Sequence, residues 1–399
     1  MTTLHDPAIL RIAVMSDLHA HTETAGPSPS HLKVLGTSSA GTIDPVRHLA
    51  ELIQEQGLEA DLLLSPGDLG DKASTEGIRY AWNCLHEIGA LLKAHLITAS
   101  SGNHDLNSRH VNFSYDPAET LQQLVPPYPL PNEADNDRYW ARKFVVKTTE
   151  HYRLAIVNSA AYHGGKPDEI EYGRVSTFTI NRLEQELKNT PLPPPVNIVL
   201  CHHHPHQFPE VFEDDDTEVM KNGQKLLSLI GNGQYGNWIV IHGHKHHARL
   251  AYAQGENSSP FVMGAGSFSA AIYSQLQPVA RNQFYLIELP LNNLSGLVGT
   301  IKSWDWTPRG WMPATDRSGL PAVCKFGCRD AVPKLASQID RLLGTKTAEN
   351  WEFVLAGIPE VEYLLPDTLA TLIGVLDRQY GIKVELENGI LKELGRKLA

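Results

Sequence analysis

Five short clusters of aspartate, asparagine and histidine lie between residues 17 and 246. Carboxylate, amide and imidazole groups together are ligands that suit Mn²⁺, Fe and Zn²⁺. The chain has 19 histidines, and eight of them form two groups between His202 and His247 rather than one low-complexity tract. The clusters are Asp17-Leu18-His19, Gly67-Asp68, Gly102-Asn103-His104-Asp105, His202-His203-His204-Pro205 and Gly243-His244-Lys245-His246. Their residue types predict a metal centre.

Seven side chains in these clusters are predicted metal ligands. If one carboxylate bridges two ions, seven ligands make two sites of four. Two ions about 3.5–4 Å apart can clamp a phosphoester during in-line displacement at phosphorus. We expect two divalent ions of Mn, Fe or Zn. The predicted ligands are Asp17, His19, Asp68, Asn103, His203, His244 and His246.

Each cluster follows a short apolar run of the kind that forms a buried strand. Because sites in open α/β sheets gather beyond the carboxyl ends of the strands, we expect the clusters to meet. Helical patterns lie between them, and Asp44 and Gly57 are the expected N-cap and stop of the first. The strand-like runs are residues 10–15, 61–65, 95–101, 197–201 and 238–241, and the helical runs are 45–56, 75–93 and 180–188. This order predicts a layered α/β domain.

The pattern changes after Ala248, because strand-like runs then follow one another without long helices between them. We interpret these runs as a second, mostly antiparallel sheet that completes a domain over residues 1–310. Residues 303–321 are rich in Trp, Pro and Gly, and we predict a linker over residues 311–330. The strand-like runs are residues 249–253, 261–265, 283–289 and 297–302.

Residues 331–399 are predicted to form a small C-terminal module, either α/β or helical. Leucines and isoleucines follow helical spacing between Leu369 and Tyr380, and residues 382–386 are a candidate strand. No cluster of chemically active residues occurs in this segment. We therefore interpret it as a surface for a protein partner or for self-association.

The five clusters resemble the motifs of the calcineurin-like metallophosphoesterases. This resemblance covers residues 17–246 and implies a four-layer α/β-β-α sandwich of two mixed sheets flanked by helices, with a dinuclear centre between the sheets. The family spacing H-x-P favours His203 as a ligand over His202 and His204. The resemblance implies that one ion is held by Asp17, His19, Asp68 and His246, and the other by Asp68, Asn103, His203 and His244.

The resemblance also implies roles in proton transfer and substrate binding. His104 would be the general acid for the leaving oxygen, and Asp71 would pair with it. A hydroxide that bridges the two ions would be the nucleophile. His21 and Arg109 are candidate substrate contacts, because His21 stands in the loop of the first cluster and Arg109 closely follows the third.

The motifs GNHD, HHP and GHxH are similar to those of the family branch that hydrolyses cyclic nucleotides and glycerophosphodiesters. We predict a phosphodiesterase that acts on nucleotide-like or other small diesters. The alternatives are a nuclease on single-stranded ends, a phosphomonoesterase and a non-catalytic scaffold. The chain has 34 Lys+Arg and 45 Asp+Glu, a net charge of −11. This balance disfavours a basic groove, so nucleic acid is expected only as a substrate.

Composition sets further bounds on the class of protein. The 399 residues are 42% hydrophobic and 20% charged, as in soluble globular proteins. No apolar run reaches the roughly 20 residues that span a bilayer, and the first residues do not form a signal peptide. Four cysteines make no disulfide framework, so we expect a cytoplasmic protein. Cys324 and Cys328 could be packed thiols, metal ligands or a disulfide. The acidic run Asp214-Asp215-Asp216 is interpreted as a solvated loop, and a further metal site is the alternative.

Overall fold

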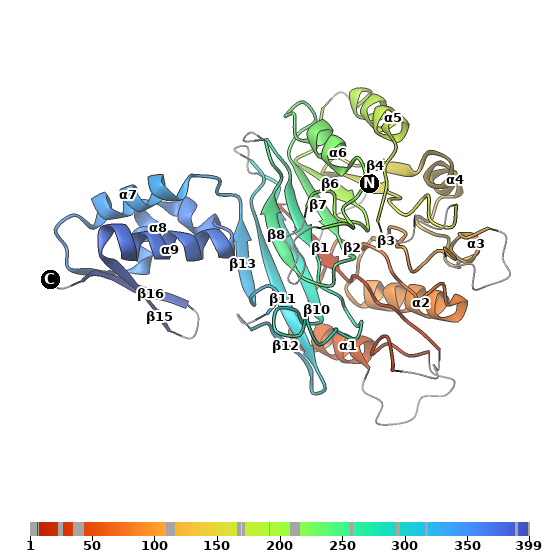
Figure 1. Ribbon diagram of the computed structural model, residues 1–399, viewed down its shortest axis with the longest axis horizontal. Coiled ribbons are helices and arrows are strands. Elements are labelled where there is room, and N and C mark those ends of the chain that lie inside the picture. The colour runs from red at the N-terminus through yellow and green to blue at the C-terminus, as the bar shows by residue number, and fades with distance from the viewer. Residues whose placement is uncertain are drawn as a thin grey trace. The chain divides into compact units, whose positions relative to one another are not determined.

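The computed structural model divides the chain into two units, each described here by itself. The first unit comprises Met1–Leu297 and Lys302–Ala322, and the second comprises Val298–Ile301 and Val323–Ala399 (Figure 1). Side chains of residues 387 and 390 are not described. The described residues are 6, 8–22, 27–34, 44–108, 116–165, 169, 172–190, 192–207, 216–255, 258–292, 296–315, 318–387 and 390–397.

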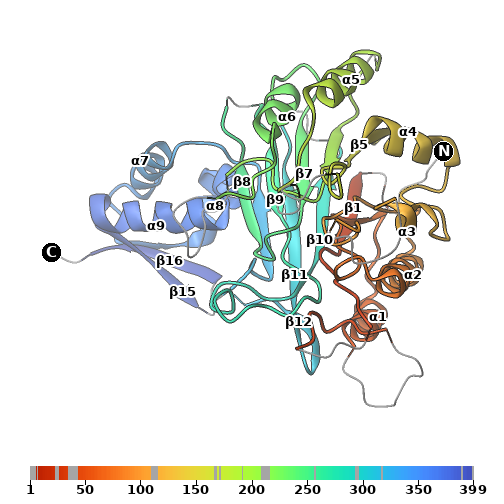
Figure 2. The same ribbon diagram turned by 45° about the vertical axis from the view of Figure 1, so that its right-hand side comes forward.

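The first sheet joins the earliest strands of the chain to later ones. β1, β2 and β3 are parallel neighbours. β10 pairs antiparallel with β1, beside which it lies in Figure 2. The strand order is β12-β11-β10-β1-β2-β3, and β13 pairs with β11. The bounds are β1 Ile9–Val14, β2 Leu62–Ser65, β3 Leu96–Ala99, β10 Gln283–Pro290, β11 Gly299–Thr307, β12 Gly310–Pro313 and β13 Val323–Phe326.

The second sheet has the order β4-β5-β6-β7-β9-β8. Its central strands β5, β6, β7 and β9 are parallel, and the edge strands β4 and β8 are antiparallel to their neighbours. The bounds are β4 Phe144–Thr148, β5 Tyr152–Val157, β6 Val196–Leu200, β7 Trp238–His242, β8 Arg249–Tyr252 and β9 Phe261–Gly264. Both sheets are therefore mixed.

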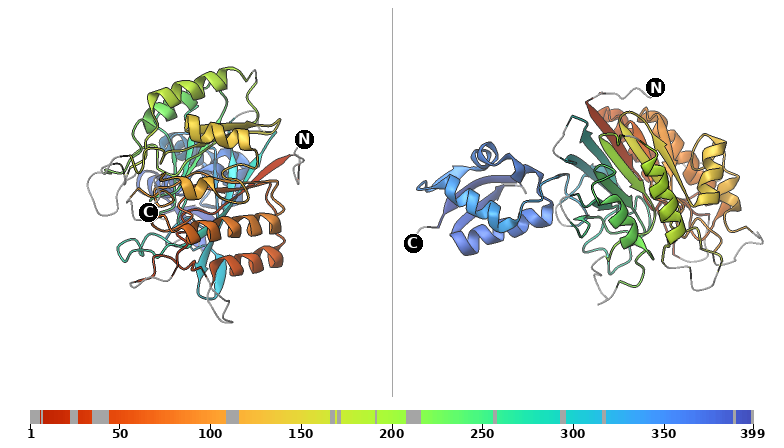
Figure 3. Two further views of the ribbon diagram at one scale, coloured as in Figure 1. Left: turned by 90° about the vertical axis from the view of Figure 1, so that its right-hand side faces the viewer. Right: turned by 90° about the horizontal axis from the view of Figure 1, so that it is seen from above.

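Helices lie on the outer faces of the two sheets. In the left view of Figure 3, α1 and α2 (orange) lie at one side of the stacked sheets, and α5 and α6 (green) lie at the other. The predicted α/β sandwich of two mixed sheets flanked by helices is confirmed. The bounds are α1 Pro45–Gln56, α2 Thr75–Leu91, α3 Glu119–Gln122, α4 Glu133–Arg142, α5 Thr177–Lys188 and α6 Gly223–Ile230.

Local sequence signals explain where these helices begin and end. The Asp44 side chain accepts hydrogen bonds from the first backbone N–H groups of α1, and Gly57 ends the helix in the left-handed region at φ 60°. These bounds agree with the sequence prediction. Helix α5 begins three residues earlier than predicted, because Ser176 caps it by accepting from the N–H of Thr179.

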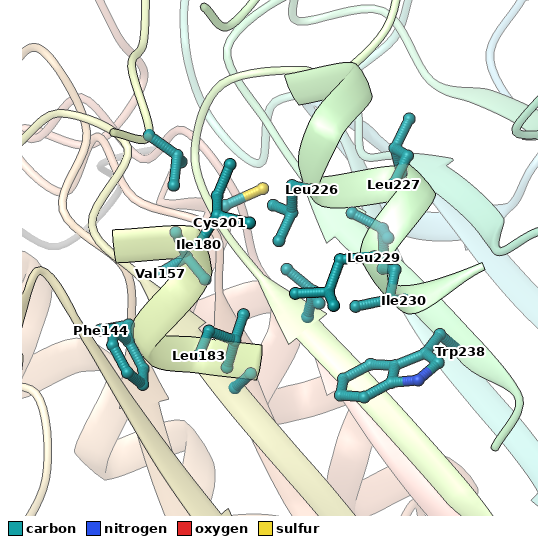
Figure 4. Packing of buried hydrophobic residues seen from close by; sticks show 14 of the residues in the cluster. Phe144, Val157, Ile180, Leu183, Cys201, Leu226, Leu227, Leu229, Ile230 and Trp238 are labelled. Carbon is teal, nitrogen blue, oxygen red and sulfur yellow. The ribbon is translucent and has the colours of Figure 1, made fainter. Parts of the chain in front are cut away.

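A large apolar cluster holds α5 and α6 against the second sheet. Leu183 of α5 and Leu226 of α6 belong to one buried cluster with Phe144 of β4 and Trp238 of β7 (Figure 4). Burying such side chains contributes about 1.5–3 kcal/mol each to folding. The cluster therefore keeps β6 and β7, which carry the fourth and fifth sequence clusters, in a fixed position.

The strands after Ala248 do not form a sheet of their own, so this prediction is wrong. β8 and β9 extend the second sheet, whereas β10, β11 and β12 extend the first. The reason is long-range pairing, because β9 lies parallel to β7 and β10 lies antiparallel to β1. Apolar alternation within a strand carries no information about which distant strand it joins.

The segment 311–330, predicted to be a linker, contains the end of β12 and the whole of β13. The boundary between the units falls at Ala322 and Val323. The Trp311 ring is buried and donates from its Nε1 to the carbonyl of Pro45 at 2.8 Å. The Trp-rich stretch up to Ala322 thus packs within the first unit.

The second unit has its own apolar core, which the described residues build from three α-helices, a short 3-10 helix and a small sheet. Its strands have the order β14-β16-β15. Cys324, Cys328 and the two other cysteines are free and buried. Among the described residues, no helix combines the length and hydropathy that crossing a bilayer requires. The bounds are α7 Val332–Leu343, β14 Ala348–Asn350, α8 Trp351–Gly357, η1 Pro359–Tyr363, α9 Pro366–Tyr380, β15 Ile382–Glu387 and β16 Ile390–Arg396.

Candidate metal centre

The five sequence clusters meet at the carboxyl ends of strands from both sheets. Three clusters follow β1, β2 and β3 of the first sheet, and two follow β6 and β7 of the second. Within the part of the chain that the structure describes, four groups of three residues place one possible ligand atom each within 4.8 Å of one another. All four groups are built from residues of these five clusters, so the predicted convergence is observed.

The first ligand set consists of Asp17, His19, Asp68 and His246. His19 Nε2 lies 3.1 Å from His246 Nε2 and 3.4 Å from Asp68 Oδ2, and His246 Nε2 lies 3.5 Å from Asp17 Oδ1. An ion with bonds of about 2.1 Å separates adjacent ligand atoms by about 3.0–3.4 Å, depending on the angle between the bonds. The observed spacing and the donor set therefore fit a divalent ion.

The second ligand set shares Asp68 with the first. His202 Nε2 lies 3.3 Å from Asp68 Oδ2 and 3.0 Å from Asn103 Oδ1. Asn103 Oδ1 also lies 3.2 Å from His244 Nδ1. These separations fit the same bond lengths. Asp68 Oδ2 belongs to both sets, which is the position that a bridging carboxylate requires.

His202 Nε2 faces Asp68 and Asn103 of the second set, whereas the predicted ligand His203 has a possible ligand atom within 4.8 Å of those of His202 and His244. His203 makes its hydrogen bond at Nδ1, 2.9 Å from Ser159 Oγ. The spacing to Pro205 favoured His203 in the sequence. Spacing does not show which way each of the three consecutive histidine side chains points. Side-chain direction at the end of β6 decides between them, and it directs His202 toward Asp68 and Asn103.

The carboxylates of the first set carry negative charge without an ion. Burial alone would raise the pKa of Asp17, but its hydrogen bond to His246 and the charge of that ring outweigh it and lower the pKa to about 2. For Asp68, burial is likewise outweighed by the charges of His202 and His104, which hold its pKa well below the usual range. Two ionised carboxylates among imidazoles form a donor set that attracts divalent cations.

Five of these ligand residues have the left-handed backbone conformation that non-glycine residues seldom adopt. The φ angles are 52° at Asp17, 48° at His19, 55° at Asp68, 76° at His244 and 52° at His246. Each such position costs on the order of 1–3 kcal/mol and persists where the surrounding structure enforces it. These five are half of the ten non-glycine residues with positive φ in the described part of the chain, and such residues often cluster at functional sites.

Two motif glycines are needed because carboxylates occupy the space where a Cβ would lie. A Cβ on Gly102 would lie 2.1 Å from Asp68 Oδ1, and a Cβ on Gly243 would lie 2.3 Å from Asp17 Oδ2. Neither glycine has a positive φ, so the constraint is close approach and not backbone freedom. The motif glycines thus allow the ligand loops of different strands to touch.

Replacing Gly243 with alanine is expected to displace the Asp17 carboxylate and weaken metal binding at the first set by about 10–100-fold, the size of effect seen when a ligand loses its support. Competition titration of the purified protein with a chelating dye measures this change. Gly374→Ala, in helix α9 of the second unit, is the control and should leave the affinity unchanged. Equal affinity in Gly243→Ala and the wild type would contradict the assignment of Asp17.

Asp105 is a site residue to which the sequence analysis gave no role. Its carboxylate is buried and accepts hydrogen bonds from the backbone N–H groups of Asp68, Leu69, Gly70 and Gly102 at 2.6–3.1 Å. It therefore joins the loop after β2 to the loop after β3. Its place in the motif GNHD was the available signal, but spacing alone does not reveal that its partners are backbone groups.

His104 and Asp71 form the predicted pair. Asp71 Oδ1 lies 3.0 Å from His104 Nδ1, closer than the backbone nitrogen of Lys72 at 3.3 Å. Burial would raise the pKa of Asp71, but hydrogen bonds to His104 and His19 outweigh it and hold that pKa well below its usual range. The His104 side chain is 20% exposed, so the ring can be reached by a substrate.

The structure gives His21 a structural role instead of the predicted substrate contact. Its Nδ1 bonds to the carbonyl oxygen of Thr22, and its Nε2 lies 2.7 Å from Ser28 Oγ. Both ring nitrogens are therefore engaged, and the ring is buried. Arg109, the other predicted substrate contact, lies outside the described residues.

The sequence analysis predicts a solvated loop for the acidic run before α6. The structure differs at the described end of this run. Asp216 is buried, and its Oδ2 lies 2.8 Å from His204 Nε2. Glu218 lies 2.7 Å from Lys245 Nζ and 3.5 Å from His244 Nε2. Asp214 and Asp215 lie outside the described residues. This segment thus packs beside the fourth and fifth clusters.

Two family models match the chain. The model described as calcineurin-like phosphoesterase matches residues 10–248, which is more than half of the chain. A second model, described as wHTH-Calcineurin_assc, matches residues 324–378 within the second unit. No curated protein matches the chain significantly.

Several solved structures are similar to the chain at low identity. The purple acid phosphatase PPD1 from yellow lupin (Lupinus luteus) seeds is 14% identical, with 80% of this chain and 54% of that chain covered and a TM-score of 0.45. A putative 5′-nucleotidase from Staphylococcus aureus is 12% identical, with coverages of 72% and 52% and a TM-score of 0.40. The NAD nucleotidase of Haemophilus influenzae is 13% identical, with coverages of 86% and 63% and a TM-score of 0.37. The chain spans about half the length of the first two.

Proposed function

The chain belongs to the calcineurin-like phosphoesterase family and is a hydrolase of phosphoesters, and from this premise we propose that it is a phosphodiesterase acting on nucleotide-like or other small diesters. The observation that carries the proposal is the pair of ligand sets sharing Asp68 Oδ2, with the His104–Asp71 pair beside them. Two ions and a proton donor are the groups that hydrolysis of an unactivated phosphoester needs.

The residues present fit two divalent ions, and the proposed metals are Mn, Fe and Zn. One ion would be held by Asp17, His19, Asp68 and His246, and the other by Asp68, Asn103, His202 and His244. Neither set contains a thiolate, and mixed carboxylate, amide and imidazole donors suit these metals. When bound, the ions supply an activated water and neutralise charge on the phosphoryl oxygens.

Proton transfer to the leaving group falls to His104. Asp71 holds the Nδ1 side of the ring at 3.0 Å and keeps its own negative charge. This contact orients the ring and leaves its other nitrogen to face a substrate. A ring nitrogen of His104 lies within 4.8 Å of possible ligand atoms of His19 and Asp68, so the ring lies beside the first ligand set.

Several cationic side chains near the ligand loops already have partners, which favours a singly charged diester. Arg174 pairs with Glu169, Lys245 pairs with Glu218, and Lys221 lies 3.5 Å from the centroid of the Tyr172 ring, whereas Lys72, next to Asp71, is exposed. A phosphomonoester dianion or a polynucleotide would draw more strongly on such cations. The net charge of −11 supports the same choice.

The test compares initial rates on bis(p-nitrophenyl) phosphate and p-nitrophenyl phosphate with Mn²⁺- and Zn²⁺-loaded protein. We expect kcat/KM to favour the diester by about 10-fold or more, which corresponds to a difference of about 1.4 kcal/mol in transition-state binding. Asn103→Ala serves as the blank, because it removes a ligand of the second set. A monoester preference would contradict the diesterase assignment, and activity confined to single-stranded oligonucleotides would identify a nuclease.

A role for the second unit in binding a protein partner or a second copy of the chain stays a prediction, as does a cytoplasmic location. The proposal for the second unit is supported by its separate apolar core and by the family model that matches residues 324–378.

A further inference from the structure

His203 is left without a role when His202 completes the second ligand set. Its side chain is fully buried beside that set, with ring centroids 4.8 Å from His202 and 4.6 Å from His244. A Cβ on Gly173 would lie 2.4 Å from His203 Cγ, so the Gly173 backbone packs directly on the ring. The imidazole is therefore held rigidly next to the second set.

Hydrogen bonds to Ser159 determine which ring nitrogen of His203 carries the proton. Ser159 Oγ accepts from the backbone N–H groups of His202 at 3.2 Å and His203 at 3.1 Å. A hydroxyl has two lone pairs and one hydrogen, so both lone pairs are used and the hydrogen remains. That hydrogen is donated to His203 Nδ1 at 2.9 Å. Because Nδ1 accepts, the proton of the neutral ring must be on Nε2.

The Nε2–H group of His203 needs an acceptor. It is buried and has no hydrogen-bond partner among the described residues. The neighbouring His163 ring is tilted by only 32° relative to it and makes its own hydrogen bond, to the carbonyl oxygen of Tyr172. Possible ligand atoms of His202, His203 and His244 lie within 4.8 Å of one another. A buried donor with no protein acceptor is costly unless an incoming group satisfies it.

We propose that His203 is a substrate-binding residue whose Nε2–H donates to a phosphoryl oxygen held at the second ligand set. This inference rests on the proposed function, because it assigns the acceptor to the phosphate group of the ester. A protonated Nε2 does not ligate a metal, so the same geometry accounts for the absence of His203 from the ligand sets. A neutral donor fixed before the substrate arrives stabilises charge that develops on that oxygen at no cost of reorganisation.

The test separates metal binding from phosphate binding in three variants. His203→Ala removes the donor, His203→Gln keeps an amide N–H near the position of Nε2, and His202→Ala removes a ligand. We expect His203→Ala to retain two Zn²⁺ ions per chain by elemental analysis, whereas His202→Ala loses one. Calorimetric titration with inorganic phosphate should show binding that is weaker by about 10–100-fold in His203→Ala, the range for a hydrogen bond to a charged group. His203→Gln should restore most of that loss.

A second measurement does not depend on a variant's folding well. In the Zn²⁺-loaded wild type labelled with ¹⁵N-histidine, long-range proton–nitrogen correlations should show the Nε2–H tautomer for His203, assigned by its disappearance in His203→Gln. Loss of one Zn²⁺ ion in His203→Ala, or an Nδ1–H tautomer, would identify His203 as a ligand and overturn the inference. Unchanged phosphate affinity in His203→Ala would also overturn it. If the wild type binds phosphate through His203 but cleaves no diester, the proposed function fails and the inference survives.

Discussion

Asp68→Ala is expected to remove both metal ions and to lower kcat/KM by well over 100-fold, since even the loss of a group that only supports a ligand costs about 10–100-fold. Oδ2 of this carboxylate lies 3.4 Å from His19 Nε2 and 3.3 Å from His202 Nε2, so it serves both ligand sets. Its Oδ1 also accepts from the backbone N–H of His104 at 2.8 Å. One substitution therefore affects both ions and the position of the acid.

The matched control for this variant is Asp61→Ala. Asp61 is also fully buried and directly precedes β2, whereas Asp68 follows it, so the two carboxylates lie toward opposite ends of one strand. Asp61 Oδ2 accepts from the backbone N–H of Arg11 at 2.8 Å. Asp61→Ala is expected to lower stability but to keep the metal content. Two ions per chain in a folded Asp68→Ala protein, measured by elemental analysis, would refute the shared-carboxylate assignment.

His104→Ala is expected to keep both metals and to slow hydrolysis by about 10²–10⁴-fold for esters with alkoxide leaving groups, the usual contribution of a general acid. The ring belongs to neither ligand set, and its Nδ1 is held by Asp71 at 3.0 Å. Esters of p-nitrophenol should be affected much less, because their leaving group departs without a proton. The measurement is a plot of log kcat/KM against leaving-group pKa, which should be steeper for the variant.

Two further variants sharpen the test of His104. Asp71→Asn removes the charge that orients the ring, and it should reproduce part of the His104→Ala effect with the same dependence on the leaving group. His151→Ala, at the turn between β4 and β5, removes an imidazole away from the ligand loops and should leave the plot unchanged. An equal loss for all leaving groups in His104→Ala would assign the ring to substrate positioning instead of proton transfer.

Much of the fold was predictable because its signals are local. The capping residues Asp44 and Gly57 bound α1 at the predicted positions, and apolar runs located β1, β2, β3, β6 and β7. The placement of ligand types after each run predicted that the clusters would converge. The local pattern did not predict which sheet each later strand joins. β9 joins the second sheet, and β10 joins the first.

In the candidate site, too, residue types were predictable from the sequence, whereas the direction and partners of single side chains were not. The motifs identified six members of the ligand sets and the His104–Asp71 pair, because residue type and order along the chain are local information. Choosing between His202 and His203 required side-chain direction, which reverses from one residue to the next along an extended segment. His21 and Asp105 needed knowledge of their partners, which are Ser28 and the backbone of the loop after β2.

The amino-acid sequence by itself determined which residue types are available, the strand ends at which they stand and the family to which their order points. The tertiary structure decided which of these side chains face one another, and it did so through contacts between segments far apart in the chain. Left-handed φ angles at five ligand residues, and glycines that let Asp17 and Asp68 approach neighbouring loops, exist only because both sheets hold those loops together. Such conformations are unfavourable for an isolated segment, so their energy is supplied by the packed fold.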